Sequence, residues 1–414
     1  MNERSPRTIP DITRRRFLQG SSLVGFSAFL AACSTPGTGS AAPSTAASAS
    51  APASVEPVAS PSSVPQSPSA ELNFANWPLY IDTDADDETK HKTLEDFKAK
   101  YGTTVKYSEV INDNDEFFGT IQPALQAGQD TGWDLIVLTD WMASRLIRLG
   151  WVEQLDLANM PNKVANMQDV YKGVDFDPTD DHHAPWQSGM TGLGFDTVVT
   201  GELTSLASLW EANPKWKGKV TFLTEMRDTI GLTLLKLGKD PTQAAQADAD
   251  TAIAEIQKAI DAGIIRAFTG NEYAEDLVSG NVVLAMAWSG DILVKQAEKE
   301  TLAWHLPDEG GMLWTDNMLI PKGAQHKYTA ELFIDFVYDP PIAAQIAAYV
   351  NYVTPVKGAK EAIAKDADPD VAALAESPLI FPADDVLAKV KIFKTLAEAD
   401  ESYFNDKFSA VTGN

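Results

Sequence analysis

The sequence predicts an α/β protein built as two lobes. Short apolar segments typical of strands alternate with amphipathic segments typical of helices, first over residues 72–149 and again over residues 220–300. The run at 133–138 is almost continuously apolar, as in a parallel strand that helices cover on both faces. Residues 71–414 also exceed the usual size of a domain with a single core. We therefore expect open sheets flanked by helices, divided between two lobes.

The first block of elements reads strand, helix, strand, helix, strand, helix. Gly102 supplies the residue type that commonly ends a helix, which places the end of the first helix at residue 101. We expect strands at 72–77, 103–110 and 133–138, and helices at 88–101, 115–127 and 142–149.

A second block follows after a long interval. Gly238 marks the end of one of its helices. We expect strands at 220–223 and 282–288, and helices at 229–237, 244–262 and 291–300. From Tyr328 onward the chain is expected to be mostly helical, with helices at 328–338 and 342–350 and further helix to the end.

The N-terminal residues predict export and a lipid anchor. Residues 13–19 resemble a twin-arginine export motif, and the apolar stretch 23–32 leads into Leu-Ala-Ala-Cys, which resembles a lipobox ending at Cys33. The stretch is shorter than the about 20 residues that a membrane-spanning helix needs. We expect residues 1–33 to be a signal peptide and Cys33 to carry the lipid that holds the protein on the outer face of the cytoplasmic membrane. The alternative is an ordinary signal peptide with an incidental cysteine.

Residues 34–70 predict a disordered tether. They consist almost entirely of Ser, Ala, Pro, Thr and Gly, with Glu56 as the single charged residue. Such a composition buries too little apolar surface to offset the entropy of ordering. A chain of this length reaches about 30–36 Å on average, which would let the folded body move close to the membrane.

The excess of acidic over basic residues restricts the kinds of molecule that this protein can bind. The chain has 33 Lys and Arg against 58 Asp and Glu, a formal net charge of −25. Nucleic acid and anionic lipid headgroups are poor partners for such a surface, whereas a cationic ligand would be attracted to it. The alternative is that the acidity only keeps an exported protein soluble.

Aromatic and acidic residues recur where the predicted strands end. In an open α/β sheet, ligands bind beyond the carboxyl ends of the strands. Rings and carboxylates together suit a ligand with ammonium groups on an apolar stem, because rings offer cation–π contacts and carboxylates neutralise buried ammonium charge. The alternatives are that Glu225, Asp228 and Asp291 only cap helices or complement helix dipoles, and that the tryptophans are ordinary core residues. The strand-end residues are Trp77, Tyr80, Thr139, Trp141, Glu225, Asp228, Trp288, Asp291, Trp314 and Asp316.

Six short motifs, taken in order, resemble one family. They are Asn-Trp-x-x-Tyr at 76–80, Trp-Asp-Leu-Ile-Val at 133–137, Thr-Glu-Met-Arg-Asp at 224–228, Trp-Ser-Gly-Asp at 288–291, Gly-Gly-x-x-Trp-x-Asp at 310–316 and Asn-Tyr-Val-Thr-Pro at 351–355. Across residues 72–408 this order resembles the spermidine/putrescine-binding proteins of bacterial ABC importers. The resemblance implies a polyamine ligand, permease subunits as membrane partners, and a monomer. It also implies that Tyr352 joins the ten strand-end residues as a ligand contact.

The same resemblance implies a two-lobe, type II periplasmic-binding-protein fold with a hinged cleft. The chain would cross between the lobes near residues 184–192, near 314–318 and after Thr354. Lobe 1 would then comprise residues 71–184 and 317–356, and lobe 2 residues 185–316 and 357–414.

Other functions are weaker alternatives. An exported glycoside hydrolase could use the same four acids, Glu225, Asp228, Asp291 and Asp316, as acid and base. A binding protein for another cationic or nitrogenous solute is the nearer alternative. Neither metal nor cofactor is expected: the acids from Asp82 depart from a calcium loop at its sixth and twelfth positions, and His182 and His183 have no third ligand at a suitable spacing.

Overall fold

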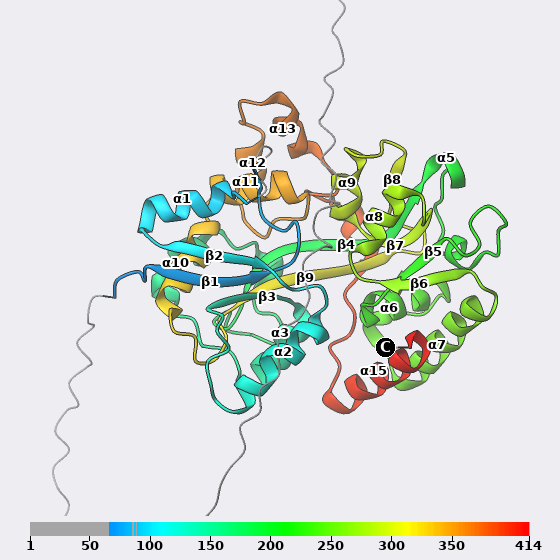
Figure 1. Ribbon diagram of the computed structural model, residues 1–414, viewed down its shortest axis with the longest axis horizontal. Coiled ribbons are helices and arrows are strands. Elements are labelled where there is room, and N and C mark those ends of the chain that lie inside the picture. The colour runs from blue at the N-terminus through cyan, green and yellow to red at the C-terminus, as the bar shows by residue number, and fades with distance from the viewer. Residues whose placement is uncertain (1–65, 85–86, 88, 414) are drawn as a thin grey trace, which may run out of the picture. The chain divides into compact units, whose positions relative to one another are not determined.

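The computed structural model describes residues 66–84, 87 and 89–413 (Figure 1). The predicted signal peptide, Cys33 and nearly all of the predicted tether lie outside the described residues. Among the described helices, none is both long enough and apolar enough to cross a membrane.

The first predicted block is confirmed. Its elements are β1 (Glu71–Asn76), α1 (Lys92–Tyr101), β2 (Thr104–Glu109), α2 (Asn114–Gln126), β3 (Leu135–Thr139) and α3 (Asp140–Arg148). Strand β1 pairs in parallel with both β2 and β3, as the apolar run at β3 predicted. Helix α1 begins later than expected, and Asp82 Oδ2 accepts the backbone N–H of Thr93 in its first turn at 2.9 Å. Two short helices follow, α4 (Pro161–Asn166) and, after the next strand, α5 (Thr197–Thr200).

Two long strands, β4 (Ala184–Asp196) and β9 (Gly311–Leu319), join the two halves of the sheet. They pair antiparallel, and β9 also pairs with β3 while β4 pairs with β7. The strand order is β2-β1-β3-β9-β4-β7-β5-β6, so β9 and β4 lie at its centre (Figure 1). All thirteen residues of β4 are buried, which leaves no polar–apolar alternation for a sequence pattern to detect.

The second block contains the predicted elements and three more. Predicted ones are β5 (Val220–Leu223), α6 (Met226–Lys236), α7 (Gln246–Asp261), β7 (Leu284–Trp288) and α9 (Ser289–Gln296); unpredicted ones are β6 (Ile265–Thr269), α8 (Glu272–Ser279) and β8 (Leu302–His305). Strand β6 lies at the edge of the sheet and includes the exposed Arg266, which breaks its apolar pattern.

The tail is less regular than expected. Helices α10 (Lys327–Val337) and α11 (Pro340–Val350) match the prediction. After them come only short pieces and one long helix: α12 (Ala359–Ile363), α13 (Pro369–Ala373), α14 (Asp384–Leu387), β10 (Val390–Lys391) and α15 (Glu398–Thr412). Short 3-10 turns complete the described elements, at Leu157–Asn159, Asp169–Tyr171, Leu206–Trp210, Pro241–Gln243 and Leu374–Glu376.

The apolar residues form separate cores that correspond to two lobes. One core includes Phe222 and Met286 of the second block, and Phe404 of α15 also belongs to it. Leu72 and Phe333 lie in another core, and a third packs beneath α2 and α3. The long strands contribute to both sides, because β4 places one end in each lobe's core and β9 does the same.

One expected lobe boundary is wrong in part. Ala359, Ile363 and Ile380 pack in the core that contains Leu72, so they belong with lobe 1 and not with lobe 2. The chain returns to the other core only at Phe393. Apolar contacts between distant residues decide lobe membership here, and no local sequence pattern indicates which core these short helices contact. We propose that residues 357–381 be assigned to lobe 1.

Candidate functional site

The carboxylate of Asp316 lies where β9 meets β3. Thr139 is its register partner on β3, and the Thr139 hydroxyl donates to Asp316 Oδ1 at 2.7 Å. The hydroxyl of Tyr80 donates to Asp316 Oδ2 at 2.9 Å. Burial raises the pKa of Asp316 to about 6, because its charged form loses water and gains only neutral donors.

A second carboxylate, that of Asp291, lies in the first turn of α9. It accepts hydrogen bonds from the hydroxyls of Tyr352 at 2.8 Å and Tyr273 at 2.7 Å, and from the amide of Asn271 at 3.0 Å. Burial raises its pKa. Asp291 lies in the first turn of α9, where its charge also complements the helix dipole as the local alternative expected, although no side chain caps the start of that helix. Tyr273 and Asn271 were not predicted, because they belong to the unpredicted helix α8 and the turn before it.

Two further acids lie at the start of α6. The indole N–H of Trp288 donates to Asp228 Oδ2 at 2.8 Å, and burial raises the pKa of Asp228 to about 6. Glu225 is the N-cap of α6 and accepts the backbone N–H of Arg227 at 3.2 Å, so the cap alternative is correct for its local contact. Burial nevertheless raises the pKa of Glu225 to about 8. Asn114 of α2 donates to both Glu225 Oε2 at 3.5 Å and Thr139 Oγ1 at 2.9 Å.

Four aromatic rings form a row that connects these carboxylates. The ring centroids of Tyr80 and Tyr352 are 5.5 Å apart, those of Tyr352 and Trp314 5.4 Å, and those of Trp314 and Trp288 6.3 Å, all edge to face. Two glycines make room for the row. A Cβ at Gly290 would lie 2.6 Å from the Tyr352 ring, and one at Gly189 would lie 2.2 Å from the Trp314 ring.

We call this group the interlobe cluster. Its eight members were all predicted from the sequence and are connected by the hydrogen bonds and ring contacts described above. They are Tyr80, Thr139, Asp228, Trp288, Asp291, Trp314, Asp316 and Tyr352.

Glu225 lies beside the interlobe cluster and lines a cavity of about 610 Å³. The first turn of α2 contributes Asp115 and Glu116 to the same cavity, and Asp113 precedes them as the N-cap of that helix. Glu272 of α8 adds a further acid from the other lobe. The cavity therefore carries a strong excess of carboxylates next to the cluster.

Two of the predicted tryptophans, Trp141 and Trp77, are not members of the interlobe cluster. The guanidinium carbon of Arg227 lies 3.8 Å from the centre of the Trp141 ring, and that of Arg145 lies 4.9 Å from it. The cation–π capacity of Trp141 is thus used by the protein's own arginines. Trp77 donates its indole N–H to the Val137 carbonyl at 3.0 Å and packs against the cores of lobe 1. Within the described residues, neither ring packs against an aromatic ring of the interlobe cluster.

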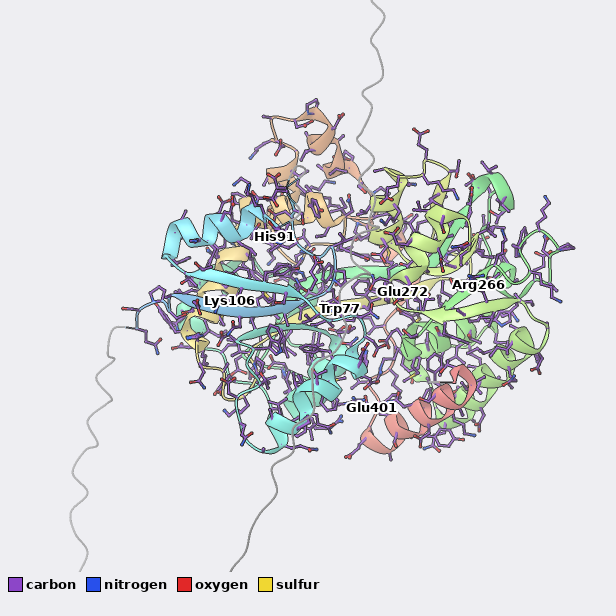
Figure 2. The ribbon with its side chains drawn as sticks, viewed as in Figure 1. Trp77, His91, Lys106, Arg266, Glu272 and Glu401 are labelled. Carbon is purple, nitrogen blue, oxygen red and sulfur yellow. The ribbon has the colours of Figure 1, made fainter. Side chains whose placement is uncertain are left out.

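The arginines over Trp141 belong to an ionic network that connects the lobes. Glu401 of α15 accepts from Arg227 of α6 at 2.7 Å, and both residues are buried. Across the boundary, Arg145 and Arg148 of α3 approach the same carboxylate at 3.2 and 3.4 Å. Figure 2 labels Glu401 on the end of α15 nearest α2 and α3. Neither Glu401 nor Arg227 was singled out from the sequence as an interlobe residue, because nothing in a linear pattern connects positions 145, 227 and 401.

Comparison with known proteins gives the family. Residues 92–373, more than half of the chain, match the family described as "Bacterial extracellular solute-binding protein". The chain belongs to this family. It is 27% identical over 297 residues to the spermidine/putrescine-binding periplasmic protein of Escherichia coli (strain K12), covering 71% of this chain and 80% of that protein. It is also 27% identical over 341 residues to the putrescine-binding periplasmic protein PotF of the same organism, covering 78% of this chain and 86% of that protein.

Solved structures show the same fold. A putative spermidine/putrescine ABC transporter from Listeria monocytogenes superimposes with a TM-score of 0.71 at 24% identity, covering 83% of this chain and 99% of that one. The Tp0655 lipoprotein of Treponema pallidum gives a TM-score of 0.68 at 18% identity over 83% of this chain. The predicted two-lobe, type II periplasmic-binding-protein fold is confirmed.

The ionic network predicts that Glu401 holds the lobes together. In Glu401→Gln the buried Arg227 loses its carboxylate, and lobe 1 loses two cross-boundary ion pairs. We expect the ligand-free variant to show a larger radius of gyration in small-angle X-ray scattering, and a lower free energy of unfolding. Asp115→Asn is the matched control, because it removes an Arg145 ion pair between α2 and α3 of the same lobe. Equal radii for Glu401→Gln and wild type would contradict the assignment.

Proposed function

We propose that this protein captures a polyamine, putrescine or spermidine, between its lobes and delivers it to an ABC importer. The observation that carries the proposal is the placement of two buried acids, Asp228 and Asp316, and one half-buried acid, Asp291, beside a row of four aromatic rings. The named relatives that bind spermidine or putrescine support the same ligand class.

The charge of the cluster favours a cation. Asp228, Asp291 and Asp316 accept hydrogen bonds only from hydroxyl, amide and indole groups in the described structure. Ammonium groups would supply the missing positive charge and would lower the pKa of each carboxylate they contact. Methylene groups between the ammonium groups would pack against the rings of the row, and an ammonium group over a ring face would add a cation–π contact of about 0.5–2 kcal/mol.

We propose binding without catalysis as the role of these acids. Membership in a family of solute-binding proteins supports this role over that of a glycoside hydrolase. Closure of the lobes about β4 and β9 would enclose the ligand, and the closed form would then meet the permease subunits. Another cationic or nitrogenous solute is the remaining alternative, and a panel of amines, amino acids and quaternary ammonium compounds in a thermal-shift assay separates it from polyamines.

We also propose that the protein acts as a monomer held at the membrane through Cys33. This proposal rests on the lipobox-like residues before Cys33 and on the tether composition after it. The expected location agrees with the extracellular family.

Removal of one cluster charge tests the ligand class. Asp316→Asn and Asp228→Asn should each weaken putrescine and spermidine binding by about 2–5 kcal/mol, because a buried ammonium loses its ionic partner. Isothermal titration calorimetry measures the loss. Asp385→Asn on the exposed α14 is the control and should bind as wild type does. Full affinity in both cluster variants would exclude these acids from the binding site.

Acidification should weaken polyamine binding. Asp228 and Asp316 have raised pKa values of about 6 in the ligand-free protein. A bound ammonium favours the ionised form, so affinity is greatest above the raised pKa and is lost as the pH falls through it. We expect a loss of up to about tenfold per carboxylate for each pH unit below 6.

Calorimetry between pH 8 and pH 5 checks this dependence, with proton release measured in buffers of different ionisation enthalpy. Binding at pH 7 should release part of a proton because Glu225, with a pKa of about 8, lies beside the cluster. Asp316→Asn should show a shallower pH profile than wild type. A constant affinity from pH 7 to pH 5 would contradict the mechanism.

Membrane attachment depends on Cys33 in this proposal. Cys33→Ser removes the thiol that a lipid would modify, so the variant should appear in the soluble fraction while wild type remains with the membrane. Fractionation followed by immunoblotting measures the distribution. Equal retention of both proteins at the membrane would show that the anchor is not at Cys33.

A further inference from the structure

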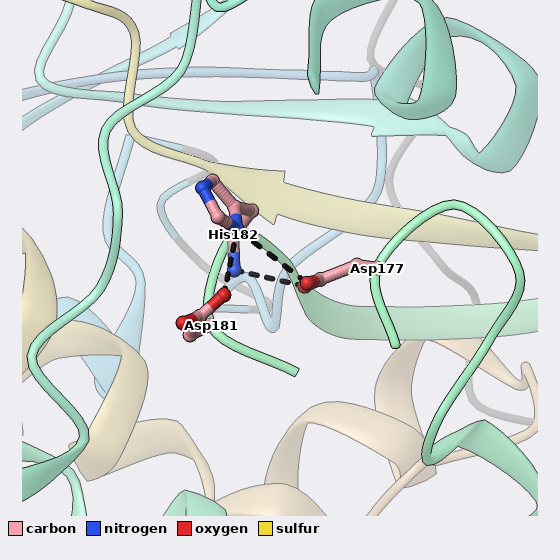
Figure 3. Close-up of side chains that lie close together, drawn as sticks. All are labelled: Asp177, Asp181 and His182. Atoms are coloured by element: carbon pink, nitrogen blue, oxygen red, sulfur yellow. Dashed lines mark hydrogen bonds and ion pairs between the residues drawn. The ribbon is translucent and has the colours of Figure 1, made fainter. Parts of the chain in front are cut away.

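A second group of polar side chains lies in the loop before β4. The carboxylates of Asp177 and Asp181 and the imidazole of His182 come within 4.8 Å of one another (Figure 3). Sequence analysis found no third ligand for the histidine pair. The loop supplies two, because the Asp180 N–H donates to the Asp177 carbonyl at 3.2 Å in a turn that brings Asp177 near residues 181 and 182.

One oxygen of each carboxylate contacts the surrounding protein, and the other lies near the same imidazole. The Thr179 hydroxyl also donates to these second oxygens, at 2.7 Å to Asp181 Oδ1 and 3.4 Å to Asp177 Oδ1. Asp177 Oδ2 pairs with His183 Nδ1 at 2.6 Å and accepts the His182 backbone N–H at 2.8 Å. Asp181 Oδ2 accepts the Gln154 amide at 2.7 Å. The remaining oxygens, Asp177 Oδ1 and Asp181 Oδ1, lie 3.5 and 2.7 Å from His182 Nδ1. Such fixed outer contacts are typical of side chains that orient metal ligands.

These separations suit a small divalent ion. Zinc binds imidazole nitrogen and carboxylate oxygen at about 2.0–2.2 Å, so neighbouring ligand atoms are about 3.4 Å apart in a tetrahedral site and about 3.0 Å apart in an octahedral one. The observed 3.5 and 2.7 Å lie close to these values. A nitrogen ligand also favours zinc-class ions over calcium, which prefers oxygen ligands alone.

The group is accessible from solvent on one side. The side chain of Asp177 is 1% exposed, whereas that of His182 is 32% exposed. An ion could therefore enter past His182 and Asp181 and meet the buried Asp177 at the base, with water completing its coordination.

We propose that Asp177, Asp181 and His182 bind a divalent transition-metal ion of the zinc class. The ion would brace the loop at the entrance to β4, because His183 directly precedes Ala184, the first residue of that strand. It would also tie this loop to the preceding segment, where the Leu155 N–H donates to the Asp181 carbonyl at 2.6 Å. The proposal is independent of the polyamine function.

The test uses the full chain after treatment with a chelator. Zinc chloride titrated by calorimetry should bind at one ion per chain and raise the melting temperature. Asp181→Asn, which keeps the side-chain shape, and His182→Ala should each weaken zinc binding at least tenfold and abolish the rise. Calcium chloride should give no saturable binding.

His326→Ala is the matched control. His326 Nδ1 pairs with Asp134 Oδ2 at 3.0 Å, but within the described residues this pair belongs to no group of three such ligands. Its zinc binding should equal that of wild type. The absorption spectrum of bound cobalt(II) distinguishes binding at the proposed group from binding at Cys33, the single cysteine of the chain. Thiolate ligation adds a charge-transfer band that nitrogen and oxygen ligands lack. If zinc does not bind saturably, or binds both variants as it binds wild type, the group is an ion pair only. If calcium binds as tightly as zinc, the proposed preference for zinc-class ions is wrong.

Discussion

Three carboxylates lie between the lobes, of which Asp228 and Asp316 are buried and Asp291 is half-buried. Asp228 and Asp291 come from lobe 2, and Asp316 lies on β9, which crosses between the lobes. Among the described residues, none of the three forms an ion pair within 4 Å, although hydroxyl, amide and indole donors surround them. Burial without a counter-charge raises the pKa of each acid. This unpaired negative charge makes a cationic ligand the natural completion of the site, and the aromatic row and close-packed glycines give that site its shape.

The protein's own cations are kept apart from those acids. Arg227 and Arg145 stack on Trp141 and form ion pairs with Glu401, so both guanidinium groups stabilise the contact between the lobes. Trp141 is consequently part of the interlobe support. Separation of the two electrostatic systems has a physical reason: an arginine placed among the cluster acids would occupy the position that a ligand ammonium needs.

The cavity beside Glu225 extends the acidic surface toward solvent. Acids from the start of α2 and from α8 line it, and Asn114 links Glu225 to Thr139 of the cluster. Carboxylates that line a concave surface focus the electrostatic potential and raise the local concentration of cations. The net charge of −25 acts in the same direction over longer distances, although salt screens it. The fold thereby combines long-range attraction with short-range, desolvated recognition.

The sequence by itself determined the α/β class, most strands and helices, and seven residues of the interlobe cluster, because strand ends and local apolar periodicity are properties of short segments; the eighth, Tyr352, came from the family resemblance. Tertiary structure alone decided which rings touch. Trp141 and Trp288 both follow a strand end in sequence, yet one stacks on Arg227 and the other donates to Asp228. Tyr273 and Asn271 reach Asp291 only through an unpredicted helix. Strand β4 and the lobe of residues 357–381 were likewise decided by long-range burial. Contacts between residues distant in the chain depend on sheet order and crossing strands, which no local pattern encodes.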